Sequence, residues 1–144
     1  MPEITFYFNV QQREIALCQL VSKALQHKNT MNILTDSESD SRSLDGLLWE
    51  IPSIGFLPHC RADHPLAMET PICIDARDEL LHPRDILFNW RTCLPPTLEN
   101  HTRIIEIIDT SETLKLDARQ RFRAYQAQGI TVRSVDMAAR QASA

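Results

Sequence analysis

Segments typical of β-strands alternate with segments typical of helices, and this order restricts the fold more than any other feature of the sequence. Residues 4–10 and 31–35 are rich in β-branched, aromatic and aliphatic side chains, which favours strands. The first is followed by a stretch with helical spacing of its apolar residues, 11–26, and a second helix is expected to begin at Asp36 or Ser37. Such alternation predicts a largely parallel or mixed sheet with helices on both faces, a three-layer α/β/α fold.

The rest of the chain returns to this pattern after an irregular middle. Residues 51–71 contain four prolines and indicate a loop with at most a short helix at 53–57. The elements expected after it are a short strand, a strand or brief helix, a buried strand, a helix followed by Gly129, and a last strand, at residues 72–74, 85–90, 103–108, 111–125 and 130–135. We therefore expect one domain over residues 1–137 and a flexible, alanine-rich tail over 138–144.

The scarcity of glycine separates this α/β pattern from the common nucleotide-binding sites. The chain contains only Gly46, Gly55 and Gly129, from which neither G-x-G-x-x-G nor G-x-x-x-x-G-K-[ST] can be written. Those motifs need glycine because the backbone approaches the phosphates closely. The sequence thus predicts a Rossmann-like shape without a phosphate-binding loop.

Composition and charge narrow the class of protein further. Hydrophobic residues make up 43% and charged residues 24% of the chain, values typical of a globular domain. The most apolar stretch, 47–57, is interrupted by polar residues and proline and is too short to cross a bilayer. A net charge of -4 argues against direct binding to nucleic acid as the main function. The start lacks a secretory signal and the four cysteines are widely spaced, so we expect a cytoplasmic protein with reduced thiols.

No set of residues predicts catalysis or metal binding. The acidic run at 36–40 lacks the glycine and the distal glutamate of a calcium loop, and acidic residues are favourable at a helix start in any case. His59, Cys60 and His64 have no fourth ligand at a recognised spacing. There is no G-x-S-x-G motif for a hydrolase. We expect no enzyme activity, no cofactor and no metal.

The helix expected after residue 111 carries cations on one edge. Lys115, Arg119 and Arg123 are spaced by four residues and therefore form one stripe. Phe122 falls beside the stripe, and the end of the preceding strand at Ile108 offers an apolar floor. Such a stripe is either a solvated face or a docking surface for a partner that is acidic and partly apolar.

A second cluster of large side chains lies in or beside the proline-rich segment. It consists of Trp49, Phe56, Leu57 and Pro58. Aromatic side chains in loops either fill a gap in the core or anchor an interface with another protein, and both interpretations remain open for this cluster.

Several short motifs together resemble one family over nearly the whole chain. They are Thr5-Phe6-Tyr7, Leu48-Trp49, Phe56-Leu57-Pro58-His59, Arg84-Asp85-Ile86-Leu87, Arg91-Thr92, and the helix from Leu114-Lys115 through Ala118-Arg119-Gln120-Arg121-Phe122-Arg123-Ala124-Tyr125 to Gly129. The chain resembles the chi subunit of bacterial DNA polymerase III holoenzyme, an accessory protein of the clamp loader. The resemblance implies a single α/β domain without a phosphate-binding loop.

The resemblance also implies a ligand for the basic helix. Members of that family bind the acidic, phenylalanine-terminated tail of the single-stranded-DNA-binding protein. By matching motif, Lys115, Arg119 and Arg123 would meet the acidic groups and the terminal carboxylate, while Ile108 and Phe122 would receive the aromatic ring. Family members often have tyrosine where Phe122 stands, so here the hydroxyl is lost and the apolar wall is kept.

The aromatic cluster acquires a function by the same resemblance. Members of the family pair with the psi subunit, which links them to the clamp loader, and in some relatives the same surface receives an XPD-like helicase. The residues expected to line this surface are Trp49, Phe56, Pro58 and His59.

Three hypotheses of different classes follow. The leading one is a noncatalytic adaptor that couples the single-stranded-DNA-binding protein to the clamp loader in DNA replication. The alternative is a small Rossmann-like nucleotide-binding enzyme, which predicts thermal stabilisation by a nucleotide. The third is direct DNA binding by the basic helix, against which the overall acidity argues.

Overall fold

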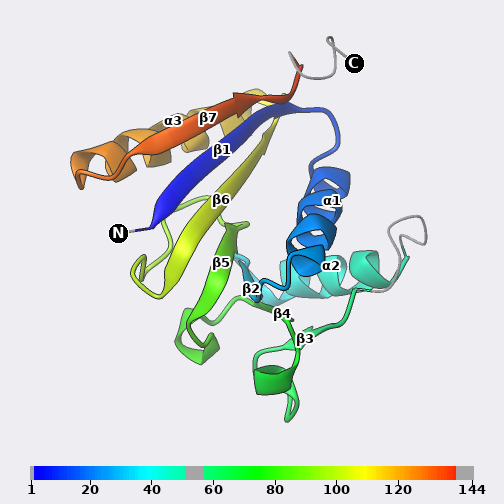
Figure 1. The fold of residues 1–144 in the computed structure, drawn as a ribbon. Helices are drawn as coiled ribbons and strands as arrows, with labels where there is room; N and C mark the ends of the chain where they lie inside the picture. The colour runs from blue at the N-terminus through cyan, green and yellow to red at the C-terminus, as the bar shows by residue number, and fades with distance from the viewer. Residues whose placement is uncertain (1, 51–56, 139–144) are drawn as a thin grey trace.

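The computed structural model describes residues 2–50 and 57–138, and its strands form one parallel sheet (Figure 1). The strand order is β3-β4-β2-β5-β6-β1-β7, and every neighbouring pair is parallel. The strands are β1 Glu3–Val10, β2 Met31–Leu34, β3 His59–Arg61, β4 Ile72–Asp75, β5 Arg84–Asn89, β6 His101–Asp109 and β7 Val132–Asp136. The predicted largely parallel sheet is confirmed.

Helices cover both faces of this sheet, as the alternating pattern predicted. They are α1 Arg13–Gln26, α2 Glu38–Glu50 and α3 Glu112–Ala127, with short 3-10 helices η2 Ala67–Glu69 and η3 Asp78–Leu80. Figure 1 shows α1 and α2 on one face, and α3 behind β1 and β7 on the other. The three-layer α/β/α arrangement is therefore confirmed. None of the helices in the described residues is long and apolar enough to cross a membrane.

Strand β6 shows how the two halves of the core are divided. Ile105 and Ile107 pack in the cluster under α1 and α2, whereas Ile104 and Ile108 pack in the cluster under α3. Successive side chains of a strand point to opposite faces, so a strand that is covered on both faces needs apolar residues at nearly every position. Each buried isoleucine stabilises the fold by about 1.5–3 kcal/mol. The lone acidic residue in this run is Glu106.

The proline-rich middle contains more regular structure than we predicted. Residues 59–61 were expected to be loop, but they form β3, which pairs in parallel with β4 at the edge of the sheet. A strand of three residues is too short to produce an alternating pattern, and it exists because β4 offers an edge to pair with. Residues 85–90, which fitted a strand or a brief helix, lie largely in strand β5.

Two of our predictions fall wholly or mostly outside the described residues. The short helix expected at 53–57 lies outside them except for Leu57, which is buried in the core. The flexible tail expected at 138–144 lies outside them except for Ala138. The four cysteines, which we expected to be reduced, are all free thiols.

The last helix and strand are joined by a tight connection that brings them side by side. Ser111 caps the start of α3 by accepting a hydrogen bond from the Leu114 backbone N–H. Gly129 follows the helix with φ of 78°, a conformation that costs glycine least, and turns the chain back into β7. Strand β7 then pairs with β1, which itself lies between β6 and β7. The first strand of the chain therefore lies between its last two.

Candidate functional site

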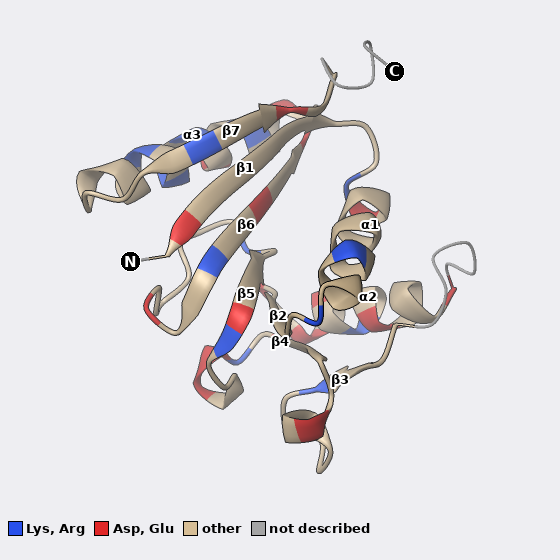
Figure 2. Cartoon of the chain, in the orientation of Figure 1, with Lys and Arg blue, Asp and Glu red and all other residues tan. Residues whose placement is uncertain are grey.

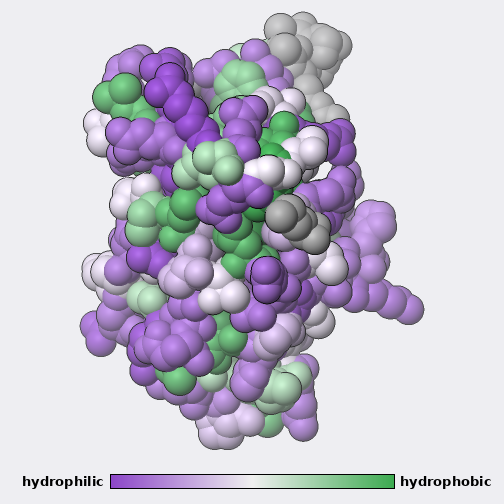
Figure 3. All heavy atoms as spheres, turned by 90° about the vertical axis from the view of Figure 1, so that its left-hand side faces the viewer, coloured by the Kyte–Doolittle hydropathy of each residue, from purple (hydrophilic) through white to green (hydrophobic). Residues whose placement is uncertain are grey.

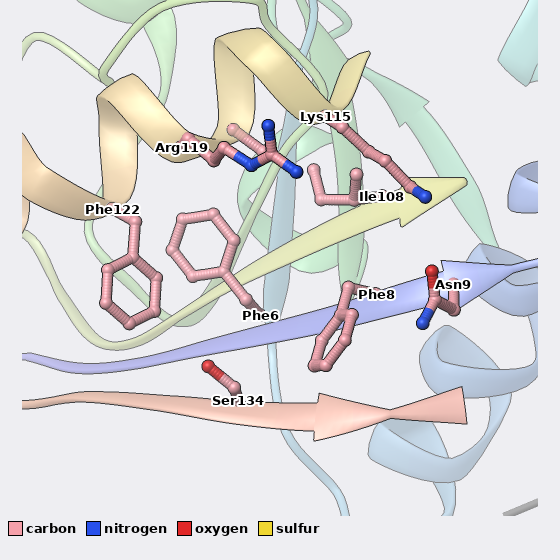
Figure 4. Close-up of a pocket in the computed structure, with 9 residues that line it drawn as sticks. Phe6, Phe8, Asn9, Ile108, Lys115, Arg119, Phe122 and Ser134 are labelled. Atoms are coloured by element: carbon pink, nitrogen blue, oxygen red, sulfur yellow. The ribbon is translucent and has the colours of Figure 1, made fainter. Parts of the chain in front are cut away.

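A pocket of about 400 Å³ lies between α3 and the β6-β1-β7 end of the sheet (Figure 4). Its lining residues come from both ends of the chain and are Phe6, Phe8, Asn9, Ile108, Lys115, Ala118, Arg119, Phe122 and Ser134. Of the five residues predicted for the basic site, the structure brings together Ile108, Lys115, Arg119 and Phe122 around this one pocket. Arg123 is exposed on α3 and is not among the lining residues.

The floor of the pocket is apolar and firmly packed. Phe6 and Ile108 are only 3% and 2% exposed, so their positions are fixed by the core. The ring of Phe6 lies 5.3 Å from the ring of Phe122, measured between centroids, and 6.0 Å from that of Tyr125. Tilted and edge-on aromatic pairs at these distances are favourable. An apolar group that enters the pocket therefore meets a preformed wall.

Two cations border this floor without a carboxylate partner. Figure 4 shows the Arg119 guanidinium and the Lys115 ammonium on either side of Ile108. Among the described residues, no acidic side chain lies within ion-pair distance of either group. The arginines near β3 and β4 differ, because Arg61 and Arg77 are each paired with carboxylates. The positive charge at the pocket is thus available to a ligand.

A buried polar network lies under α3 and fixes how the helix sits on the sheet. Glu106 is fully buried, and its carboxylate accepts hydrogen bonds from Arg121 Nε at 3.1 Å, Tyr125 Oη at 2.8 Å and Asn89 Nδ2 at 2.8 Å. Arg121 also donates to the Thr92 carbonyl at 2.9 Å. Burial raises the pKa of the Glu106 carboxyl, and the positive charge of Arg121 opposes that shift.

The partner of Arg121 was not predicted from the sequence. The helix after residue 111 was expected beside a buried strand, but Arg121 was not paired with Glu106 inside that strand. Arg121 is 3% exposed and points into the protein, so it adds nothing to the exposed stripe. The signal was present: a single Glu in a run of buried isoleucines needs a partner, and Arg121 and Tyr125 lie one helical turn apart.

Sequence reasoning also missed the contribution of β1 and β7 to the pocket. Phe6 and Phe8 alternate along β1, and Ser134 pairs in register with Phe6. Asn9 has φ of 58° and donates from Nδ2 to Asp136 Oδ1 at 3.1 Å, which links the ends of β1 and β7. Nothing in the local pattern shows that two strands whose paired residues are 128 positions apart, such as Phe6 and Ser134, are neighbours, since that depends on the topology of the sheet.

The second predicted cluster lies at the opposite end of the sheet. Trp49, at the end of α2, is 58% exposed, and its ring lies 4.7 Å from the ring of buried His59. The two ring nitrogens of His59 lie 2.6 Å from the Leu57 carbonyl and 3.2 Å from the Asp45 carbonyl. Pro58 is half-buried beside them. Phe56 lies outside the described residues, and the structure places the other three predicted residues, Trp49, Pro58 and His59, at this end of the sheet.

Comparison with known proteins adds a family to this geometry. Residues 1–133 match the model of a family described as DNA polymerase III chi subunit, HolC. The chain belongs to this chi-subunit family. The resemblance inferred from the motifs in the sequence is confirmed, and the match includes β1, β6 and α3, which form most of the pocket.

Three curated chi-family relatives have similar sequences, and each is named DNA polymerase III subunit chi. The relative from Pseudomonas aeruginosa is 28% identical over 112 residues, which cover 78% of each chain. The relative from Haemophilus influenzae is 29% identical over 117 residues, 81% of each chain. The relative from Escherichia coli is 25% identical over 120 residues, 83% of this chain and 82% of that one. Membership in the chi family assigns the chain to DNA polymerase III and DNA replication.

Proposed function

We propose that this chi-family protein is a noncatalytic adaptor that binds the acidic, phenylalanine-terminated tail of the single-stranded-DNA-binding protein. Through the psi subunit it would link that tail to the clamp loader. Its contact with DNA would then run through its partners, and it would act in the cytoplasm with the replication machinery. The observation that supports the proposal best is the pocket in which an apolar aromatic floor is bordered by Lys115 and Arg119, neither of which has an ion-pair partner within residues 2–50 and 57–138.

The chemistry of a terminal phenylalanine suits this pocket. Its ring would lie on Phe6, Phe8, Ile108 and Phe122, where aromatic rings prefer tilted contacts. Its carboxylate would meet Arg119, whose planar guanidinium can donate two parallel hydrogen bonds, and Lys115, which acts as a point charge. Acidic residues just before the phenylalanine would gain from the same positive field. Affinity should therefore fall as salt concentration rises.

Replacing Arg119 by alanine should weaken binding of a fluorescent peptide ending in Asp-Phe by about 10- to 100-fold. The basis is that a hydrogen bond to a charged group contributes about 1.5–3 kcal/mol. Fluorescence anisotropy measures the dissociation constant directly.

Arg42→Ala is the matched control, because Arg42 is an exposed arginine on α2, on the other face of the sheet. It should change the affinity by less than about twofold. A peptide ending in Asp-Ala should bind weakly to the unaltered protein, since the ring is missing. Equal binding of the peptide to the Arg119→Ala and Arg42→Ala variants would remove Arg119 from the site.

We propose the surface around Trp49, Pro58 and His59, with Phe56, as the contact with psi and, in organisms that have one, with an XPD-like helicase. Support comes from the large exposed fraction of Trp49 and its tilted ring contact with buried His59. Tryptophan is enriched among interface residues that dominate binding energy.

Trp49→Ala should reduce co-purification of psi by at least about 10-fold, while leaving the peptide affinity unchanged. Leu116→Ala on α3 is a suitable control, because Leu116 is similarly exposed, at 55%, and lies on another element. The fold of each variant is checked by its thermal unfolding curve. Full retention of psi by a folded Trp49→Ala variant would contradict this assignment.

A further inference from the structure

Strand β7 forms one edge of the sheet and opens directly onto the pocket. It pairs with β1, and in the part of the chain that the structure describes no strand pairs with its other side. An edge strand presents backbone N–H and C=O groups that another extended segment can pair with. Ser134, in the middle of β7, is exposed and also lines the pocket. A peptide whose end lies in the pocket can therefore leave it across this edge.

The two ends of this edge differ in charge. Arg133 is exposed near the start of β7, and Arg123 is exposed near the end of α3, which leads into β7 through a short connection. Figure 2 shows basic residues on both α3 and β7. Neither arginine has an ion-pair partner among the described residues. At the far end, Asp136 places a carboxylate beside Asn9. An acidic segment is therefore attracted to the first end.

The two arginines also lie on opposite faces of the sheet. Ser134 faces the pocket and α3, so Arg133, its neighbour in the strand, projects toward the other face. No described helix covers β7 on that face (Figure 1). A segment that runs along the edge in extended conformation points alternate side chains to the two faces. Its acidic side chains would thus reach Arg133 on one face and Arg123 on the other.

The surrounding surface favours a polar partner over an apolar one. Figure 3 views the molecule from the side at which α3 ends and β7 begins, and hydrophilic residues there surround smaller apolar patches. Glu3, at the start of β1, lies on the same face as Arg133, because it is two residues before Thr5, which pairs with Arg133. Glu3 is also in register with Arg103 of β6, and no ion pair between Glu3 and Arg133 forms among the described residues. Arg133 therefore remains available to a second carboxylate.

We infer that the acidic segment preceding the terminal phenylalanine runs along the free edge of β7 from the Val132 end, with its carboxylates paired to Arg133 and Arg123. The inference rests on the proposed function, because it needs the terminal residue in the pocket. It goes beyond that function by assigning Arg133, which does not line the pocket, to recognition of the residues farther from the tail's end.

Two labelled peptides separate the pocket from the edge. One is a tetrapeptide ending in Asp-Phe, which fits the pocket alone, and the other is a dodecapeptide with the same end and acidic residues before it. The unaltered full chain should bind the dodecapeptide about three- to tenfold more tightly, as expected for two or three exposed ion pairs. Arg133→Glu should abolish this advantage and change tetrapeptide binding by less than about twofold. Arg42→Glu should leave both affinities as they are.

Each failure has a distinct meaning. If the tetrapeptide does not bind at all, the proposed function fails and the inference with it. If the tetrapeptide binds but the ratio of the two affinities is the same for Arg133→Glu and the unaltered protein, only the inference is overturned. A dodecapeptide whose acidic residues are replaced by their amides should bind no more tightly than the tetrapeptide. If this uncharged dodecapeptide still binds more tightly, charge does not cause the higher affinity and the inference is overturned.

Discussion

Replacing Arg121 by methionine should lower the free energy of unfolding by about 3–5 kcal/mol, because it leaves the Glu106 carboxylate buried without its counter-ion. The pair is closed to water, with Arg121 3% exposed and Glu106 0% exposed. Tyr125 and Asn89 would still donate to Glu106, but they carry no charge to balance it. Since a domain of this size is stable by about 5–15 kcal/mol, roughly a fifth or more of the total stability is at stake. Urea denaturation followed by circular dichroism measures the loss.

The chain offers a close control for this substitution. Arg123→Met makes the same change two residues farther along α3, at an exposed position, and should cost less than about 0.5 kcal/mol. Adding Glu106→Gln to Arg121→Met removes the unpaired charge but keeps an acceptor for Tyr125 and Asn89, so part of the lost stability should return. Equal losses for Arg121→Met and Arg123→Met would show that the buried pair does not hold α3 in place.

Acidification should destabilise the protein through His101 by about 3 kcal/mol between pH 7 and pH 4. Burial, helped by the nearby positive charge of Arg84, lowers the pKa of His101 from 6.5 to about 4. The unfolded chain therefore takes up a proton as the pH falls below about 6.5, whereas the folded protein resists it until about pH 4. The stability that the neutral His101 ring contributes is therefore fully present above pH 6.5 and is lost as the pH falls from 6.5 to about 4.

The hydrogen bonds around His101 independently indicate that its ring is neutral in the folded protein. Its Nε2 lies 2.9 Å from Asn32 Nδ2, whose amide also donates to the His82 carbonyl at 2.8 Å. An amide nitrogen only donates, so Nε2 must accept and therefore carries no proton. Protonation would set two donors against each other inside the core.

Carboxylates also titrate between pH 4 and pH 7. The contribution of His101 is therefore obtained by comparing the pH dependence of stability in a His101 variant with that of the unaltered protein. His101→Gln retains a side-chain acceptor and should show a flatter fall in stability with acidity than the unaltered protein. His27→Gln, at an exposed position, should show an unchanged profile. Parallel profiles for His101→Gln and the unaltered chain would refute the assignment to His101.

What the sequence predicted well are the features that depend on residues close together in the chain. The strand at 103–108 and the helix after Ser111 follow from local periodicity, and both are present as β6 and α3. Helical spacing alone also brought Lys115, Arg119 and Phe122 to one side of α3, where they border the pocket. Helical spacing could not show that Arg123, one turn farther along α3, lies outside the pocket. The extent of the pocket depends on where β1 and β7 lie.

The features that the sequence did not predict depend on pairing between segments that are far apart in the chain. Phe6 and Phe8 look like ordinary strand residues until β1 is placed beside β6 and β7. Arg121 looks like one more surface cation until Glu106 is seen beneath it. In both cases the side chain has one local pattern and two possible environments, and only the tertiary arrangement decides between them.

The position of β1 between β6 and β7 has a consequence for how the protein is made. The pocket joins side chains from Phe6 to Ser134, so the aromatic residues of its floor are synthesised well before Ser134. Pairing across such a separation carries a large loop-closure cost and comes late in folding. A nascent chain that ends before β7 would therefore carry the basic helix and the aromatic residues of β1, but it would lack Ser134 and the edge strand that complete the pocket.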